Sequence, residues 1–292
     1  MTGGLPASKD IEAALAGLAT VPDDDVDLAE TALMLAALER PRVAFERYRL
    51  HLADLAEAVG REAMRRRGDI PPFREDAKFE LDARIGALIA VIAEANGYRG
   101  DELTYDDLQN ANLMRVIDRR RGLPVALGIL YIHAARAQGW SAHGLNFPAH
   151  FLVALEISGE RAIVDPFRGT RVGDAGALRS LLKTVLGADA ELSPAHCATL
   201  ANRAVLLRLQ NNIKSRLAAQ GRSEKAAAVV DRMLLFAPNQ AALWQEAGAL
   251  HAKIGNLRAA AAALERFMEL TRDPVARAQA AQALQALRRQ MN

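Results

Sequence analysis

The sequence predicts an α+β protein with a helical region at each end. Strand patterns occur only in the middle of the chain, at residues 141–155 and 161–165. The segments before them repeat apolar residues every three or four positions, which is the spacing of one face of an α-helix. From about residue 199 onward the chain is rich in alanine and carries an internal 34-residue repeat. We therefore expect a first domain over residues 1–198 and an all-helical domain over residues 199–292.

The composition is typical of a globular protein, and its charge balance does not indicate a strongly charged partner. Of the 292 residues, 51% are hydrophobic, and 37 Lys and Arg stand against 35 Asp and Glu. This near balance gives no reason to expect nucleic acid or an anionic membrane as partner. The sole cysteine, Cys197, excludes an internal disulfide and fits a reducing compartment. No apolar run reaches the ~18 residues of a membrane span, and the N-terminus lacks the basic start of a signal peptide. We expect a cytoplasmic protein.

Apolar stripes predict five helices before the strands, and Thr104 with Asp107 three residues on resembles the start of a further one. The stripes place the five helices at residues 11–19, 28–38, about 48 to 60 or 67, 79–95 and 125–137. Pro22 and Pro41 separate the first three, and Gly97 and Gly139 can end the last two. The helix at 125–137 is apolar nearly all round, so it is expected to be the buried centre of the first domain.

The strand region carries one histidine and ends in one aspartate. His150 lies among alternating apolar residues in FPAHFLVAL, and Asp165 ends the next strand, 15 residues later. Ser158-Gly159 is a hairpin turn signal, so the two strands are expected to be neighbours. Pro148 marks an edge or a bulge. A short helix is predicted at residues 176–186.

A helix, a strand with a histidine and a strand with an aspartate can assemble a Cys-His-Asp hydrolase site. In such a site the thiol lies at the helix N-terminus, where the dipole and free N–H groups lower its pKa and can hold an oxyanion. Here Pro124 begins the helix, and Leu123 and Val125 beside it are inert. Nothing in the pattern directs Cys197 toward His150. Loss of a nucleophile costs ~10⁴–10⁶ in rate, so thiol-dependent catalysis is not expected.

These segments resemble those of transglutaminase-like proteins. RGLPVALGILYIHAARAQGW is similar to their central helix, which a Gly-x-Cys segment opens, and PAHFLVAL and VDPFRG are similar to their histidine and aspartate strands. The runs from Asn112 to Pro124, Pro148 to Phe151 and Asp165 to Gly169 also resemble the bacterial SirB family, a transglutaminase-like core followed by tetratricopeptide repeats.

The resemblance covers the chain from about residue 30 onward and has three implications for the site. It implies a papain- or transglutaminase-like core with a small antiparallel sheet. His150 and Asp165 would match the histidine and aspartate of the triad. Pro124 would match the position of the lost cysteine to within one residue.

The last third of the chain is similar to tetratricopeptide repeats. Three pairs of residues are 34 positions apart, namely Gly221 and Gly255, Ala226 and Ala260, and Val230 and Leu264. The first repeat is degenerate, because LQNNIKSRLAAQ lacks the aromatic residue and the first glycine. A final helix at residues 274–289 would cap the array.

Three further residues are candidates for ligand binding. Asn112 can donate to an oxyanion or hold the loop before the central helix, and a structural role is favoured. Arg119 and Arg121 can bind an anion beside the cleft, although a solvated basic face is the commoner arrangement. No spacing resembles a metal site or a phosphate-binding glycine loop, so neither metal nor cofactor is expected.

Two functions remain open. One is a pseudoenzyme that binds a protein or peptide partner through the cleft, the repeats or both. The other is a hydrolase or acyl transferase in which His150 and Asp165 activate water or an amine. His150 can also be a histidine kept for packing alone, and Asp165 can be a turn-starting aspartate before Pro166.

Overall fold

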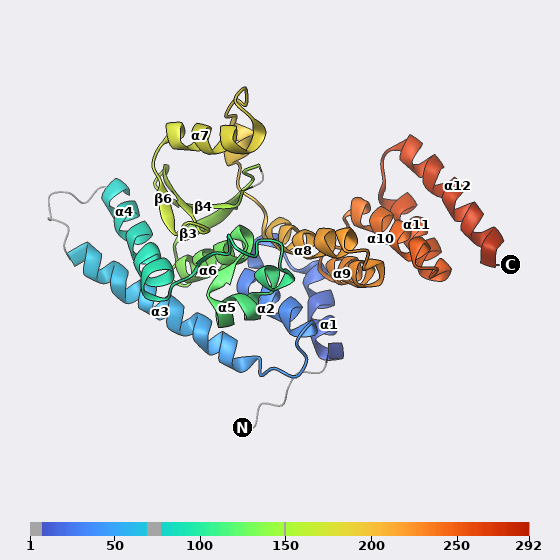
Figure 1. Ribbon diagram of the computed structural model, residues 1–292, viewed down its shortest axis with the longest axis horizontal. Coiled ribbons are helices and arrows are strands. Elements are labelled where there is room, and N and C mark those ends of the chain that lie inside the picture. The colour runs from blue at the N-terminus through green and yellow to red at the C-terminus, as the bar shows by residue number, and fades with distance from the viewer. Residues whose placement is uncertain (1–7, 69–76, 149, 292) are drawn as a thin grey trace. The chain divides into compact units, whose positions relative to one another are not determined.

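A computed structural model describes residues 8–68, 77–148 and 150–291, which group into two compact units (Figure 1). The first contains residues 27–206, and the second contains residues 8–26 and 207–291. The sequence assigned the N-terminal helix to the first domain, but helix α1 (Ser8–Gly17) packs on helix α9 (Ser223–Phe236) of the second unit. It does so because its apolar stripe, Ile11 and Leu15, is buried there.

Helices make up most of the first unit, and two small sheets complete it. Its helical elements are α2 (Leu28–Leu38), α3 (Glu46–Gly68), α4 (Ala77–Leu88), η4 (Ile89–Ala95), η5 (Leu108–Ala111), α5 (Leu113–Arg119), α6 (Pro124–Arg136), α7 (Ala175–Leu186) and η6 (Pro194–Cys197). Its strands are β1 (Arg99–Gly100), β2 (Arg121–Gly122), β3 (Ser141–Leu145), β4 (Leu152–Ile157), β5 (Glu160–Asp165) and β6 (Thr170–Val172). Helix α8 (Asn202–Ala219) begins here and continues into the second unit.

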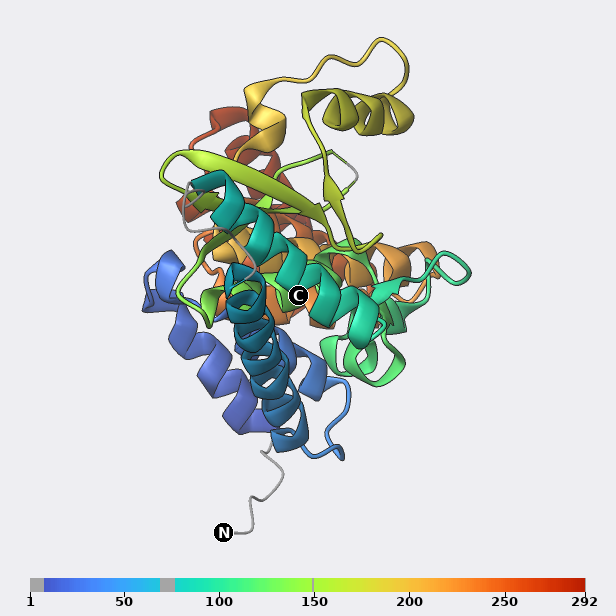
Figure 2. The same ribbon diagram turned by 90° about the vertical axis from the view of Figure 1, so that its left-hand side faces the viewer.

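The four-stranded antiparallel sheet has the order β3-β4-β5-β6 and is covered on both faces. Helices α4 and α6 pack on one face. On the other, Leu178 and Leu182 of α7 join Leu152 and Ala154 of β4 in one hydrophobic cluster. Figures 1 and 2 both show the sheet between α7 and the helices of the opposite face. Burial on both faces explains why FLVAL is apolar without interruption.

The predicted hairpin turn joins β4 to β5. Ser158 and Gly159 both have positive φ, at 49° and 85°, as a two-residue hairpin loop of right-handed strands requires. The edge strand β6 and the parallel pair of β1 with β2 were not predicted, because strands of two or three residues are too short to show a period.

The predicted helix over residues 79–95 is confirmed in extent but not in type. It is α-helical to Leu88 and then a π-helix, η4. At its end both the backbone N–H and the side-chain amide of Asn96 donate to the Val91 carbonyl, at 3.1 and 2.8 Å. This five-residue spacing widens the last turns, and Gly97 follows in the left-handed region. Wide turns of this kind are frequent at functional sites.

The second unit repeats one helix-turn-helix geometry. Its helices after α9 are α10 (Ala241–Lys253), α11 (Leu257–Leu270) and α12 (Pro274–Met291). Gly221 and Gly255 end helices in the same left-handed conformation, with φ of 72° and 77°. The predicted 34-residue spacing also brings Ala226 and Ala260 to fully buried positions, so the tetratricopeptide-like repeat is confirmed.

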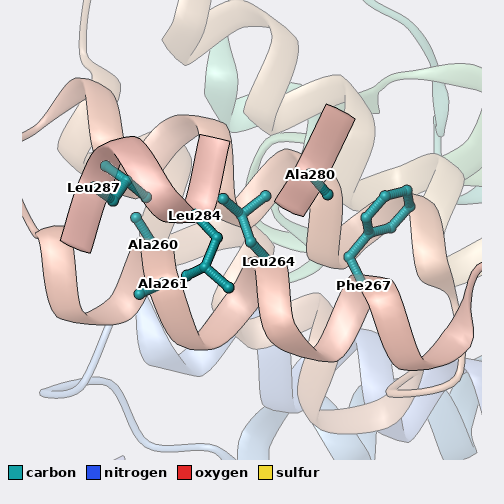
Figure 3. Close-up of a cluster of buried hydrophobic side chains, with 7 residues drawn as sticks. All are labelled: Ala260, Ala261, Leu264, Phe267, Ala280, Leu284 and Leu287. Carbon is teal, nitrogen blue, oxygen red and sulfur yellow. The ribbon is translucent and has the colours of Figure 1, made fainter. Parts of the chain in front are cut away.

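Helix α12 closes the repeats, as predicted for the final helix. Its apolar residues Ala280, Leu284 and Leu287 pack on α11 (Figure 3). Within the described part of the chain, no helix is both long and apolar enough to cross a membrane.

Candidate functional site

The structure brings His150 and Asp165 into direct contact. Nε2 of His150 lies 2.9 Å from Oδ2 of Asp165, and the two side chains are 14% and 4% exposed. The carboxylate is held from its other oxygen, because Oδ1 accepts the backbone N–H groups of Phe167 at 2.9 Å and Arg168 at 3.3 Å. Asp165 therefore starts the turn and holds the imidazole at the same time, so the two alternatives for this residue are not exclusive.

The sequence placed His150 within a strand, and this was wrong. The residue precedes β4, which begins at Leu152, and it lies in the connection that follows β3. Pro148 in this connection cannot donate a ladder hydrogen bond, which is why the predicted strand divides in two. The position of His150 therefore depends on the packing of the next residue, Phe151, rather than on strand pairing.

Phe151 anchors the histidine by filling a space between two glycines. A Cβ atom at Gly128 of α6 would lie 2.3 Å from the Phe151 ring, and one at Gly144 of β3 would lie 2.5 Å from it. The ring is fully buried. Gly128 is one helical turn from Pro124, which is the first residue of α6. The packing therefore holds the neighbour of His150 close to the first turns of the central helix.

A second connection ties the Asp165 turn to the start of α6. The N–H of Gly100 donates to the carbonyl of Phe167 at 2.7 Å, and Gly100 pairs with Gly122 in the β1–β2 ladder. Two residues later α6 begins at Pro124, with Leu123 as an N-cap that offers no side-chain hydrogen bond. Aspartate turn, histidine and helix start are thus held by one set of short-range contacts.

Two aromatic side chains, Phe167 and Tyr105, connect His150 to the surface. Phe167 lies edge-on to His150, with ring centroids 6.5 Å apart, and edge-on to Tyr105, at 5.9 Å. Tyr105 is 40% exposed, and Leu103 in the same loop is 98% exposed. Tyr105 and Phe167 were not predicted as site residues. The only signal for Phe167 was its place in the DPF run, and nothing near Tyr105 in the sequence pointed to it.

Tyr131 and the π-helix lie next to the Asp165 turn. Tyr131 of α6 is fully buried, and among the described residues its hydroxyl has no hydrogen-bond partner. Burial, and then the nearby Asp165 carboxylate, raise the pKa of Tyr131. A Cβ at Gly169 would lie 2.5 Å from Ala93 of the π-helix and 3.8 Å from the Tyr131 hydroxyl. The widened helix therefore packs directly on the aspartate turn.

The predicted binding residues have structural partners. Asn112 caps α5 by accepting the N–H of Arg115 at 3.1 Å, and its amide donates to the carbonyl of Ala36. Arg119 donates to Asp101 and Asn110, both at 2.9 Å. Arg121 donates to backbone carbonyls, and its burial lowers its pKa. These contacts favour the structural alternative for all three, and a role in binding stays a prediction.

The network around Asp101 gives a pH-dependent prediction. Hydrogen bonds from Thr104, and then from Arg119 and Asn110, lower the pKa of the buried Asp101 carboxyl from 3.8 to about 2. Asp101→Asn is therefore expected to lower the free energy of unfolding by about 2 kcal/mol at pH 7. The stabilisation is complete above the unfolded pKa of about 4 and is lost as the pH falls through the folded value.

Urea unfolding of wild type and variant at pH 7, 4 and 3 measures this effect. The difference between them should shrink below pH 4, and Glu102→Gln, at an exposed neighbouring carboxylate, serves as the control. A difference that stayed constant over this range would contradict the assigned pKa.

Comparison with known proteins agrees with this architecture. A profile of the transglutaminase-like superfamily matches residues 46–211, and a tetratricopeptide-repeat profile matches residues 213–288. A UPF0162 protein of Xylella fastidiosa (strain Temecula1) is 30% identical over 256 residues, covering 87% of each chain. A UPF0162 protein of Vibrio cholerae is 31% identical over 217 residues, covering 74% of this chain and 76% of that one.

A shorter match involves mouse F-box only protein 21, which is 30% identical over 91 residues, or 31% of this chain and 14% of that protein. The superfamily profile alone spans more than half of the chain, and the bacterial relatives align over most of it. The chain therefore belongs to the transglutaminase-like superfamily, with tetratricopeptide repeats after the core.

Proposed function

We propose that this protein is a cytoplasmic member of the SirB type, in which the transglutaminase-like core has lost its nucleophile and binds a peptide segment of a partner protein. The start of α6 supports the loss of catalysis. Leu123, Pro124 and Val125 are all buried, and none of them carries an attacking atom. Cys197 packs on the hydrophobic cluster beneath α7, which covers the face of the sheet opposite to α6.

The observation that carries the binding role is the exposed apolar loop beside an ordered His-Asp pair. The side chain of Leu103 is almost fully exposed. In the same loop the ring of Tyr105 contacts Phe167, which in turn contacts His150. Burying a leucine side chain contributes about 1.5–3 kcal/mol, which makes this loop the natural place for an apolar side chain of a bound peptide. The imidazole then lies where it can donate to or accept from the peptide backbone.

A peptide array probed with the purified full chain tests this proposal. For the best-binding peptides, Leu103→Asp is expected to raise the dissociation constant about tenfold or more, which is a loss of about 1.4 kcal/mol in binding free energy. Leu186→Asp is the matched control, because Leu186 is a leucine of the same unit with 55% exposure that lies at the end of α7. Equal losses in both variants, or no selective peptide at all, would contradict binding at this loop.

The contact between His150 and Asp165 favours a second candidate, a hydrolase in which the imidazole activates water. Ester and amide turnover that His150→Ala abolishes in the wild-type background would establish it. The binding proposal expects no turnover in either protein. Turnover and peptide binding are separate measurements, so each candidate can fail by itself.

The position of Pro124 relative to His150 is tested by placing a thiol there. In a Cys197→Ser background, the thiol of Pro124→Cys is expected to have a pKa about one or more below the ordinary 8.5, because it meets both the helix N-terminus and the imidazole. Its pKa should rise when His150→Ala is added. The pH dependence of alkylation by iodoacetamide reports both values.

The control is Pro274→Cys, at the first residue of α12, where a helix begins without a histidine in its first turn. His150→Ala should leave the thiol pKa unchanged there. If it also left the thiol of Pro124→Cys unchanged, the helix start would not face the imidazole.

A further inference from the structure

Three side chains from distant parts of the first unit meet beside the β1–β2 ladder. His51 lies on α3, Tyr98 lies between η4 and β1, and Arg120 lies between α5 and β2. Nε2 of His51 is 2.7 Å from the hydroxyl oxygen of Tyr98 and 2.8 Å from Nη1 of Arg120. Arg120 also donates to the Tyr98 hydroxyl, and its guanidinium carbon lies 4.5 Å from the centroid of the Tyr98 ring. We call these three residues the His51 cluster.

Arg120 has an unusual backbone conformation. Its φ of 57° and ψ of 27° lie in the left-handed region, which few residues with a Cβ adopt. Such conformations persist where the surrounding contacts hold them. In this turn the carbonyl of Arg120 accepts the N–H of Arg99 at 3.3 Å and the guanidinium of Arg121 at 2.8 Å. The residue that contacts His51 and Tyr98 with its side chain thus joins β1 to β2 with its backbone.

The contacts of the His51 cluster require a neutral imidazole. A guanidinium offers only donors, so the Nε2 atom that faces Arg120 has to carry a lone pair, and the ring proton is assigned to Nδ1. Burial lowers the pKa of His51 most, Arg120 lowers it further, and Asp54 on the same helix acts in the opposite direction. The neutral ring therefore stabilises the fold fully above the ordinary pKa of about 6.5, and this stabilisation is lost as the pH falls below it.

The other charged groups around the cluster have partners or lie on neighbouring elements. Asp118 of α5, which acts on Tyr98, accepts hydrogen bonds from Arg40 at 2.7 Å and Arg47 at 2.6 Å. The remaining elements packed on α3 carry further titratable groups, namely Lys78, Glu80, Asp82 and Arg84 of α4, Glu94 of η4, and Tyr131, His133 and Arg136 of α6.

We propose that the His51 cluster is a pH-sensitive lock on the β1–β2 ladder. While His51 is neutral, Arg120 stays in its left-handed turn and its carbonyl holds the N–H of Arg99. A proton on Nε2 places a second cation 2.8 Å from the guanidinium, so Arg120 moves away, its turn relaxes and the ladder opens. The loop that carries Leu103 follows β1 directly, so opening also displaces the surface proposed for peptide binding.

Hydrogen exchange of the backbone amides, followed by NMR on the full chain between pH 7 and pH 5, tests the lock. The amides of Arg99 and Gly100 donate to the carbonyls of Arg120 and Phe167, so they report on the ladder. After correction for the intrinsic pH dependence of exchange, their protection should fall about tenfold over this range, because one proton changes an equilibrium by at most tenfold per pH unit. The amide of Asn146, which donates to Ala198 at 2.9 Å, should keep its protection.

The same spectra contain a test that needs no variant. The ring of His51 should titrate with the same midpoint as the loss of protection at Arg99 and Gly100. Protection that stays constant between pH 7 and pH 5, or that is lost with a different midpoint, would overturn the proposal.

Two variants assign the effect to the cluster. His51→Gln cannot titrate, and Arg120→Gly adopts the left-handed turn without its side-chain contacts, so both should lose the pH dependence. The pKa of His51 should also rise in Arg120→Gly. His251→Gln is the matched control, since His251 is a buried histidine of the second unit whose Nε2 lies 2.9 Å from Asp231, and it should keep the wild-type behaviour. An unchanged pH dependence in folded His51→Gln would refute the lock.

The effect on peptide binding depends on the function proposed above and is measured separately. Peptides that bind the Leu103 loop should bind about tenfold more weakly at pH 5 than at pH 7 to wild type, and equally at both values to His51→Gln. If no peptide binds at either pH, the proposed function fails while the exchange data still decide the lock.

Discussion

Replacing Phe151 with alanine is expected to lower the free energy of unfolding by about 3–5 kcal/mol. The ring is 1% exposed and lies between Gly128 and Gly144. Because glycine has no side chain, neither residue can fill the space that the ring would leave. A large cavity should therefore remain between α6 and β3. Urea or thermal unfolding followed by circular dichroism measures the loss.

A second substitution separates this packing from general destabilisation. Gly128→Ala in the wild-type background places a Cβ 2.3 Å from the ring and should cost about 1–3 kcal/mol. In the Phe151→Ala background the ring is gone, and the same change should instead stabilise by up to about 1 kcal/mol, because alanine favours a helix over glycine. An equal effect of Gly128→Ala in both backgrounds would refute the arrangement of the ring.

Replacing Gly169 with alanine is expected to destabilise the protein by about 3 kcal/mol, from two sources. Its φ of +65° is unfavourable for a residue with a Cβ, and that Cβ would lie 2.5 Å from Ala93 of the π-helix. Gly169 also donates its N–H to the carbonyl of Asp165 at 2.8 Å. Displacing it should shift the carboxylate that holds His150.

Gly139→Ala is the matched control for the second source. Gly139 has a similar φ of +73°, but no heavy atom lies within 4 Å of the position of a Cβ. It should show only the backbone cost, about 1–2 kcal/mol. Urea unfolding measures the free energy of unfolding of both variants. Equal decreases would mean that the π-helix moves to accommodate the added Cβ and does not constrain the turn.

Local patterns in the sequence determined much of the fold. The apolar stripes located most of the helices, Ser158-Gly159 located the hairpin, and the 34-residue period located two left-handed turns at Gly221 and Gly255. Each of these features depends on neighbours within a few residues, through helix periodicity or turn conformation. The motif around Asp165 belongs to the same class, because its carboxylate accepts N–H groups two and three residues ahead.

The tertiary structure alone decided how these pieces meet. His150 lies 2.9 Å from Asp165, and the neighbouring Phe151 packs between Gly128 of α6 and Gly144 of β3, two glycines on different elements. The rings of Tyr105 and Phe167 likewise meet across the fold.

The first helix and the π-helix also show what the sequence predicted and what depended on the tertiary structure. The stripe of α1 predicted that a face would be buried, whereas its packing on α9 of the repeats is seen only in the tertiary structure. The stripe before Gly97 predicted a helix, and its π-turns accompany the close packing of Ala93 on Gly169. An amphipathic pattern encodes that a face needs a partner, whereas the identity of that partner depends on shape and packing over the whole chain.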